Sequence, residues 1–213
     1  MNTSVANGIL HKVKSKEPGT ILFPNDFKEF GGDDAIKTAL SRFNKEGLIR
    51  RLAKGIYVKP KYDPELGILT PSIDEIAKAI ARRDRARIIP TGTMAMYLLG
   101  LTTQVPMNVV YLTDGTPRRI NIGERGVITF RSTNPKLLSL EGDISKLIIL
   151  AMSELGESKI TNEILQKIKK NLVNEDMVKL ENDRRKSPTW ISTILKKLMT
   201  ERNYQNHGIY KTE

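Results

Sequence analysis

The sequence predicts an α+β fold, with strands and helices mixed over the first two thirds of the chain and helices alone after them. Three observations lead to this fold class. Apolar residues recur at helical spacing in several segments, and the short apolar or alternating runs between them are typical of strands. A segment with three prolines, residues 59–71, separates two patterned regions. From Asp143 onward, the spacing is helical throughout.

Before the proline-rich segment, the expected elements are short and are bounded by glycine or proline. Val5, Ile9 and Val13 have helical spacing, Pro24 suits the first turn of a helix, and Gly55 suits the turn of a hairpin. The elements expected here are helices at residues 4–14, 24–30 and 33–46, and strands at 20–23, 48–52 and 56–59. This order is that of a winged helix-turn-helix, whose recognition helix enters the major groove of duplex DNA.

After the proline-rich segment, the pattern predicts a mixed α/β domain that ends in a helical bundle. The expected elements are helices at 72–81 and 92–99, strands at 87–90, 109–113, 118–122 and 127–131, and then helices at 144–155, 160–172, 174–182 and 188–202. We therefore expect a winged helix-turn-helix domain at residues 1–62, a linker at 63–70 and a second domain at 71–213.

The chain carries a net charge of +11 and has a pI near 9.8, a balance that favours partners with many negative charges. Most of this excess comes from residues 36–61, where eight cations accompany the single anion Glu46. A charge run of this kind is often only a solvated surface, and nucleic acids and anionic membranes both attract it. Its coincidence with a helix and a glycine-turned hairpin favours duplex DNA.

The helix expected at 33–46 has one apolar and one polar face. With Ile36, Leu40 and Phe43 toward the core, hydroxyls and long cations lie on the other face, where they suit base edges and phosphates. The hairpin adds further cations, including Lys59 near its end. The residues predicted to bind DNA are Lys37, Thr38, Ser41, Arg42, Lys45, Arg50, Arg51 and Lys54, and additional phosphate contacts are predicted at Arg82, Arg83 and Arg85.

Residue types that build catalytic and metal sites are scarce. No cysteine occurs, and the two histidines, His11 and His207, lie at opposite ends of the chain. This argues against a zinc site and against a catalytic triad. A metal-dependent nuclease would need clustered carboxylates, for which Asp114, Glu124 and the segment 157–159 are the candidates. We expect no catalytic residue, no metal and no cofactor.

The sequence also indicates in which cellular compartment the protein is expected. No apolar run approaches the ~18 residues of a membrane span, and the first residues lack the apolar stretch of a signal peptide. The absence of cysteine fits a reducing compartment. We therefore expect a cytoplasmic protein that does not contact a membrane.

Two segments resemble a known family. The first is LSRFNKEGLIRRLAKGIYVKP, Leu40 to Pro60, and the second is IIPTGTMAMYLLGLTTQVPMNVVYLTDG, Ile88 to Gly115. The first resembles the N-terminal domain of the AbiE-type antitoxins, the antitoxin half of a bacterial abortive-infection toxin–antitoxin pair. Phe43 stands where the family phrase usually has leucine. The second segment is similar to one branch of this family.

This resemblance implies two roles. The winged domain would bind inverted repeats in the promoter of its own operon and repress transcription. Because a single small winged domain seldom binds a specific site tightly, we also expect two copies on the DNA, as a dimer or by cooperative binding of separate copies. The second domain would counter a nucleotidyltransferase-like toxin, often without a stable complex. Two other functions stay open: a winged-helix regulator that senses a ligand in its second domain, and a metal-dependent nuclease.

Overall fold

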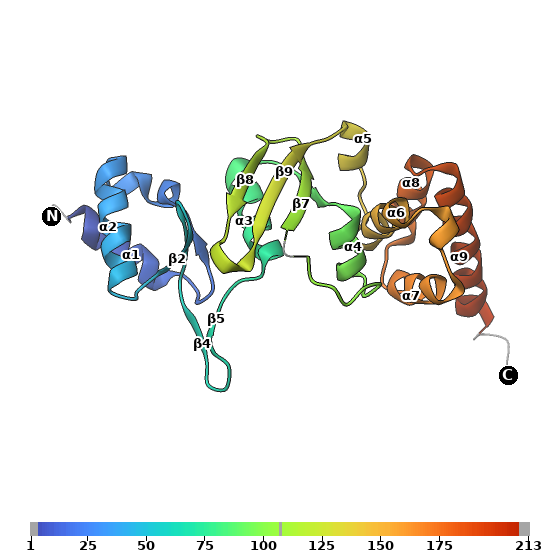
Figure 1. Ribbon diagram of the computed structural model, residues 1–213, viewed down its shortest axis with the longest axis horizontal. Helices are drawn as coiled ribbons and strands as arrows, with labels where there is room; N and C mark the ends of the chain where they lie inside the picture. Colours follow the sequence, from blue (N-terminus) through green and yellow to red (C-terminus); the bar gives the residue numbers. More distant parts are fainter. Residues whose placement is uncertain (1–3, 107, 209–213) are drawn as a thin grey trace. The chain divides into compact units, whose positions relative to one another are not determined.

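The computed structural model describes residues 4–106 and 108–208, and it confirms the α+β class (Figure 1). The chain divides into two compact units. The first comprises Met1–Arg83 and Ile120–Ile128, and the second comprises Asp84–Arg119 and Thr129–Glu213. This division assigns residues 71–83 and 120–128 to the first unit, whereas the predicted boundary follows the proline-rich segment.

The first unit begins with the elements expected from the sequence. They are α1 (Val5–Ser15), β1 (Ile21–Leu22), the 3-10 helix η1 (Pro24–Phe30), α2 (Asp33–Lys45), β2 (Arg50–Ala53) and β3 (Ile56–Val58). The strands form one antiparallel sheet in the order β1-β3-β2. Ser4 caps α1, because its side chain accepts a hydrogen bond from the backbone N–H of Asn7.

One apolar core lies beneath α1, η1 and α2. It contains Ile9, Val13, Ile36, Leu40 and Phe43, whose spacing predicted α1 and α2, together with Phe27 and Ile49. Phe23 is also buried, and Phe30 packs against the cluster, as expected of core side chains. Because this face of α2 is held by the core, the orientation of its opposite face is fixed.

The proline-rich segment is more ordered than the extended linker we predicted at 63–70. Lys61–Asp63 (β4) and Gly67–Leu69 (β5) pair as an antiparallel two-stranded sheet. Pro64 lies in the loop between the strands, where a missing N–H removes no ladder hydrogen bond. Gly67 has a φ of 73°, which glycine adopts without strain. The prolines therefore bound the strands of a hairpin instead of preventing them.

The middle of the chain forms a four-stranded sheet with helices. The elements are α3 (Ile73–Asp84), β6 (Ile88–Pro90), α4 (Gly92–Leu98), β7 (Asn108–Thr113), β8 (Arg118–Asn121), η2 (Gly123–Arg125), β9 (Val127–Ser132) and α5 (Pro135–Leu138). The strand order is β6-β7-β9-β8. The predicted helices and strands are present, and α5 and η2 were not predicted.

The second unit ends in helices that share one apolar core. They are α6 (Asp143–Leu155), η3 (Glu157–Lys159), α7 (Asn162–Leu172), α8 (Met177–Lys186) and α9 (Thr189–Gly208). Ile148, Leu172, Leu180 and Leu195 belong to this core. The last helix extends beyond the predicted end at Arg202. Among the described residues, no helix is both long and apolar enough to cross a membrane.

Two buried carboxylates hold the N-terminus of α6. Asp183 accepts hydrogen bonds from the backbone N–H groups of Glu141 and Gly142, at 2.8 and 2.9 Å, and from the hydroxyl of Ser145. Glu175 accepts from the N–H groups of Ile144 and Ser145, both at 2.6 Å. Anions are stabilised at a helix N-terminus, where backbone N–H groups lack partners within the helix. These acids are therefore explained by the fold.

Candidate nucleic-acid interface

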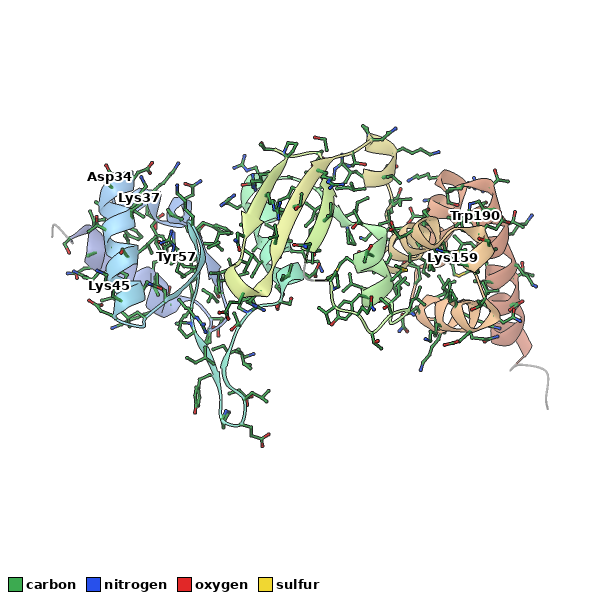
Figure 2. All side chains as sticks on the ribbon, in the orientation of Figure 1. Asp34, Lys37, Lys45, Tyr57, Lys159 and Trp190 are labelled. Atoms are coloured by element: carbon green, nitrogen blue, oxygen red, sulfur yellow. The ribbon has the colours of Figure 1, made fainter. Side chains whose placement is uncertain are left out.

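The polar face of α2 is exposed along its whole length. Ile36, Leu40 and Phe43 are buried, and the five predicted DNA-binding residues of this helix are all exposed. Figure 2 shows Lys37 near one end of α2 and Lys45 near the other. A shallow hollow on this face is lined by Lys37, Thr38, Ser41, Arg42 and Lys45. The face therefore offers hydroxyl and cationic groups together.

The hairpin of β2 and β3 presents the other predicted cations. Gly55 has a φ of 71° in the turn, and Lys54 beside it is exposed. Arg50 and Arg51 are exposed on β2, where they lie opposite Val58 and Tyr57 of β3. Because successive strand residues point to opposite faces, these two arginines do not serve the same surface.

A second hollow joins α2 to this hairpin. It is lined by Pro24, Lys37, Ser41, Asn44, Arg51, Lys54, Gly55 and Tyr57. The two elements are tied directly, because the backbone N–H of Arg51 donates to Oδ1 of Asn44 at 2.8 Å. The structure thus brings Lys37, Ser41, Arg51 and Lys54 together around one hollow, whereas Arg50 lines neither hollow. We call the other seven predicted residues, Lys37, Thr38, Ser41, Arg42, Lys45, Arg51 and Lys54, the basic surface.

Sequence reasoning missed Asn44 as part of this site. Its carboxamide does not face the core, and its partner is a backbone group seven residues away, across the end of α2. Tyr57 of β3 was not among the predicted residues either, yet it lines the hollow. Helical periodicity could have placed Asn44 beside Ser41 and Lys37, since residues three and four apart share a face.

The cations of the basic surface are only weakly held by acids. Lys37 lies 3.2 Å from Asp34, and Nε of Arg42 lies 3.4 Å from Glu46, with all four side chains about half exposed or more. Among the residues that the structure describes, Lys45, Arg51 and Lys54 make no ion pair. Exposed ion pairs contribute about 0–1 kcal/mol, so a phosphate group can replace these acids at little cost.

Lys59 has a different role from the one its charge suggested. Its ammonium group donates to the backbone carbonyls of Lys14 and Lys16, at the C-terminus of α1. This contact satisfies carbonyls that have no partner within the helix, at the end where a cation is favoured. Lys59 therefore stabilises the fold and does not belong to the basic surface.

The three arginines predicted to add phosphate contacts differ in their surroundings. Arg83 is half-buried, and its guanidinium lies over the ring of Phe23 at 4.5 Å from the centroid. Arg82 is exposed and lines a hollow with Lys78 and Glu75. Arg85 is exposed and has a φ of 54°. Arg82 and Arg85 thus keep the exposure that a phosphate contact needs, and Arg83 is engaged in packing.

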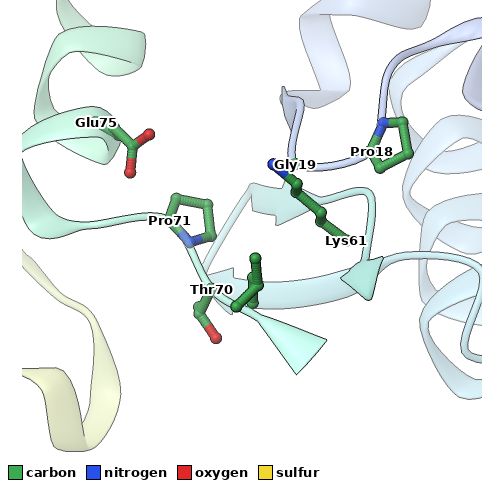
Figure 3. A pocket seen from close by; sticks show the side chains of 7 residues that line it. Pro18, Gly19, Lys61, Thr70, Pro71 and Glu75 are labelled. Carbon is green, nitrogen blue, oxygen red and sulfur yellow. The ribbon is translucent and has the colours of Figure 1, made fainter. Parts of the chain in front are cut away.

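A further hollow in the first unit is lined by Pro18, Gly19, Lys61, Leu69, Thr70, Pro71 and Glu75 (Figure 3). Its one carboxylate, that of Glu75, accepts a hydrogen bond from the backbone N–H of Ser72 at 2.6 Å. The Ser72 hydroxyl accepts in return from the N–H of Glu75, so the two form a capping box for α3. The hydrogen bonds from Ser72 lower the pKa of Glu75. They also show that the Glu75 carboxylate lies in this hollow because it caps α3.

Of the carboxylates that could serve a nuclease, that of Asp114 is engaged in structural contacts. Both oxygens of Asp114 accept hydrogen bonds from Arg87, one from its backbone N–H at 2.7 Å and one from Nε at 2.8 Å. The Arg87 contacts lower the pKa of Asp114. Glu124 lies in η2, and the segment Glu157–Lys159 is η3. Within the described part of the chain, no group of three or more acidic or histidine side chains is arranged to hold a metal ion.

Comparison with known proteins gives a family without an assigned role. A family model described as "Family of unknown function (DUF6088)" matches residues 8–180. No curated protein matches the sequence. Among solved structures, a crystal structure of the RV2827C protein from Mycobacterium tuberculosis is similar over 92% of this chain and 76% of that chain, with 11% sequence identity and a TM-score of 0.46.

Proposed function

We propose that this chain, which belongs to the DUF6088 family of unknown function, binds duplex DNA through the basic surface. One observation carries the proposal: Lys37 and Ser41 of α2 and Arg51 and Lys54 of the β2–β3 hairpin line a single hollow. The order α1, β1, η1, α2, β2 and β3 also agrees with a winged helix-turn-helix, in which α2 would be the recognition helix and the hairpin the wing.

The two parts of the basic surface would have different tasks. Ser41 and Arg42 lie on the exposed face of the helix, where side chains reach base edges in a major groove. Arg51 and Lys54 lie on the hairpin, where long cations meet phosphates whatever the sequence. The helix would then select the DNA sequence, and the hairpin would supply affinity that depends on salt.

A binding titration tests this division. Fluorescence anisotropy would compare the duplex from upstream of the gene with a scrambled duplex of equal length. Arg51→Ala and Lys54→Ala are expected to weaken binding to both duplexes, whereas Ser41→Ala and Arg42→Ala should relax the preference between them by ~1–3 kcal/mol. Failure of the wild-type protein to bind either duplex would overturn the proposal, and equal losses from both pairs of variants would overturn the division.

The resemblance at Leu40–Pro60 and Ile88–Gly115 supports a more specific proposal. The chain would repress its own promoter at inverted repeats and act as the antitoxin against a nucleotidyltransferase-like toxin encoded beside it. Co-expression with the product of the neighbouring gene tests the second role, with growth as the measurement. Growth rescue is expected. Absence of rescue would remove the antitoxin role and leave a transcriptional regulator, with its second unit as a ligand sensor.

A further inference from the structure

The β4–β5 hairpin carries exposed apolar side chains that the fold does not explain. Tyr62 is 73% exposed, Leu66 77% and Ile68 56% (Figure 1 shows the two strands). Tyr62 and Ile68 lie directly opposite each other in the antiparallel register, so they share one face of the ribbon. A two-stranded hairpin is at best marginally stable alone in water, and an apolar face on it favours a covering partner.

The charge of this hairpin differs from that of the basic surface. Residues 61–69 contain one cation, Lys61, and two anions, Asp63 and Glu65, while the whole chain carries +11. Phosphates would repel a ribbon with an excess of acid, so DNA does not suit it. A protein strand whose charges alternate in the same way suits it better.

The sequence of β4 is complementary to itself in charge. If β4 of one copy pairs in antiparallel orientation with β4 of a second copy, about a two-fold axis through Tyr62, then Lys61 of each copy lies directly opposite Asp63 of the other. Tyr62 then lies opposite Tyr62. Both chains contribute the same patch, as two-fold symmetry requires. The pairing gives two contacts between opposite charges on one face and an aromatic pair on the other.

From this register, we propose that a second copy of this chain pairs with β4 across a two-fold axis at Tyr62. The pairing makes a four-stranded sheet from two hairpins. Its apolar face holds Tyr62 and Ile68 of both copies, and its other face holds the two Lys61–Asp63 pairs. In the structure, β4 has β5 as its only neighbouring strand among the described residues, so its other edge is available for pairing.

The small area of two hairpins makes this a weak dimer. A stable interface buries about 1,600 Å² in total, and three-residue strands provide less. We therefore expect association at high protein concentration and stronger association when two copies sit on adjacent DNA sites. The inference goes beyond the proposed DNA binding, and it is tested without DNA, so either can fail alone.

A single engineered cysteine reports the axis, because the chain has no native cysteine. Directly opposite residues of antiparallel strands have Cα atoms about 4.5–5.5 Å apart, within the reach of a disulfide. Oxidation of Tyr62→Cys without DNA should therefore give a covalent dimer. Glu65→Cys is the matched control, since it is exposed on the same hairpin. Glu65 is three residues from the axis at Tyr62, so the two cysteines of a Glu65→Cys dimer would lie ~20 Å apart along the strands.

Charge variants then test the register. In the Tyr62→Cys chain, Lys61→Glu places like charges opposite each other and should lower the dimer yield several-fold. Adding Asp63→Asn should restore part of the yield, since it removes the repulsion. In the native chain, Oδ1 of Asp63 accepts hydrogen bonds from the backbone N–H groups of Glu65 and Leu66, both at 2.9 Å. Asparagine keeps a side-chain oxygen that can accept the same two hydrogen bonds.

Sedimentation of the wild-type chain gives a second measurement that needs no cysteine. We expect a reversible monomer–dimer equilibrium that Ile68→Asp shifts to monomer. Equal dimer yields from Tyr62→Cys and Glu65→Cys, or a wild-type chain that stays monomeric at every concentration, would overturn the proposal.

Discussion

The basic surface and the helices α6 to α9 both carry many cations, but those cations face different partners. In the helices, lysines and arginines meet acids: Lys169 lies 3.0 Å from Glu201, and Arg184 lies 2.6 Å from Glu181. On the basic surface, the described side chains of Lys45, Arg51 and Lys54 have no acid within ion-pair distance. Lysines and arginines that are paired with partly buried acids in the helices therefore have counterparts on the basic surface that are available to a phosphate.

This difference shows why a count of charges does not locate a site. Lys186 lies 3.1 Å from Glu141 and also donates to the backbone carbonyl of Ser139. Lys59 lies within the most basic stretch of the sequence, yet it too serves the fold. A cation contributes to DNA binding only when its partner in the free protein is solvent or an acid that is easily displaced.

The largest expected effect concerns stability in the helical region. Asp183→Ala removes the acceptor for two backbone N–H groups and one hydroxyl in a buried site. Each unsatisfied donor costs about 1–3 kcal/mol, so we expect a loss of roughly 3 kcal/mol or more in the free energy of unfolding, measured by urea denaturation. Asp143→Ala is the control, because that side chain is 88% exposed, and it should cost much less. If DNA affinity fell instead while stability stayed the same, the two regions would not have the separate roles we assign.

Asn44→Ala tests how the hairpin is positioned. The change removes the acceptor for the Arg51 N–H and leaves the core intact. We expect a loss of about 1 kcal/mol in binding to any duplex, measured by anisotropy, since one hydrogen bond that aligns two binding elements is lost. Asn171→Ala is a matched control, because Asn171 also ties a helix to a backbone group, the carbonyl of Leu99 at 3.0 Å. Equal losses of DNA affinity from both changes would contradict a local role for Asn44.

A smaller effect is expected from pH in the helical region. Hydrogen bonds from Arg184 and Arg185 lower the pKa of Glu181 to about 2, below its ordinary value of 4.5. Because the folded pKa is the lower one, this contribution to stability is complete above pH 4.5 and disappears as the pH falls toward 2. Glu181 is 30% exposed, so solvent screens these pairs in part, and Glu181→Gln should reduce the acid-dependent loss of stability by less than about 1 kcal/mol. The free energy of unfolding would be measured at pH 6 and at pH 3 for both proteins. An identical decrease between the two pH values in wild type and variant would refute a contribution from Glu181.

The smallest effect should come from Glu46, the single anion of the stretch 36–61. Glu46→Gln removes a charge that repels phosphate and releases Arg42, whose Nε lies 3.4 Å from that carboxylate. We expect DNA affinity to rise by about two- to threefold, consistent with an exposed pair of ~0.5 kcal/mol. Glu163→Gln is the control, since it frees Lys167 in α7 and should change nothing. A lower affinity for Glu46→Gln would show that Arg42 needs Glu46 for its position.

Much of the fold could be predicted because its signals are local. The spacing of Ile36, Leu40 and Phe43 predicts α2, and Gly55 predicts the turn between β2 and β3. The β4–β5 hairpin was missed because Pro64 suggested an extended chain and because Tyr62 and Ile68 are exposed, so they lack the pattern of a half-buried strand.

The contacts that could not be predicted join residues far apart in the chain. The bonds from Lys59 span 43 and 45 residues, and those to Asp183 span about 40. No sequence periodicity reports such contacts, because they arise when separate elements pack. For the basic surface, the sequence therefore predicted the side chains, whereas the structure was needed to separate Lys59 from Arg51 and Lys54.

The salt dependence of DNA binding tests the central claim most directly. The affinity of the wild-type chain would be measured over a series of salt concentrations beside two double variants, Arg51→Ala with Lys54→Ala and, as control, Lys167→Ala with Lys170→Ala in α7. We predict that the first variant lowers the log–log slope by roughly 1.8, since each lost phosphate contact removes about 0.9, and that the control leaves it unchanged. Equal slopes for all three proteins, or a larger change in the control, would contradict the assignment of DNA binding to the basic surface.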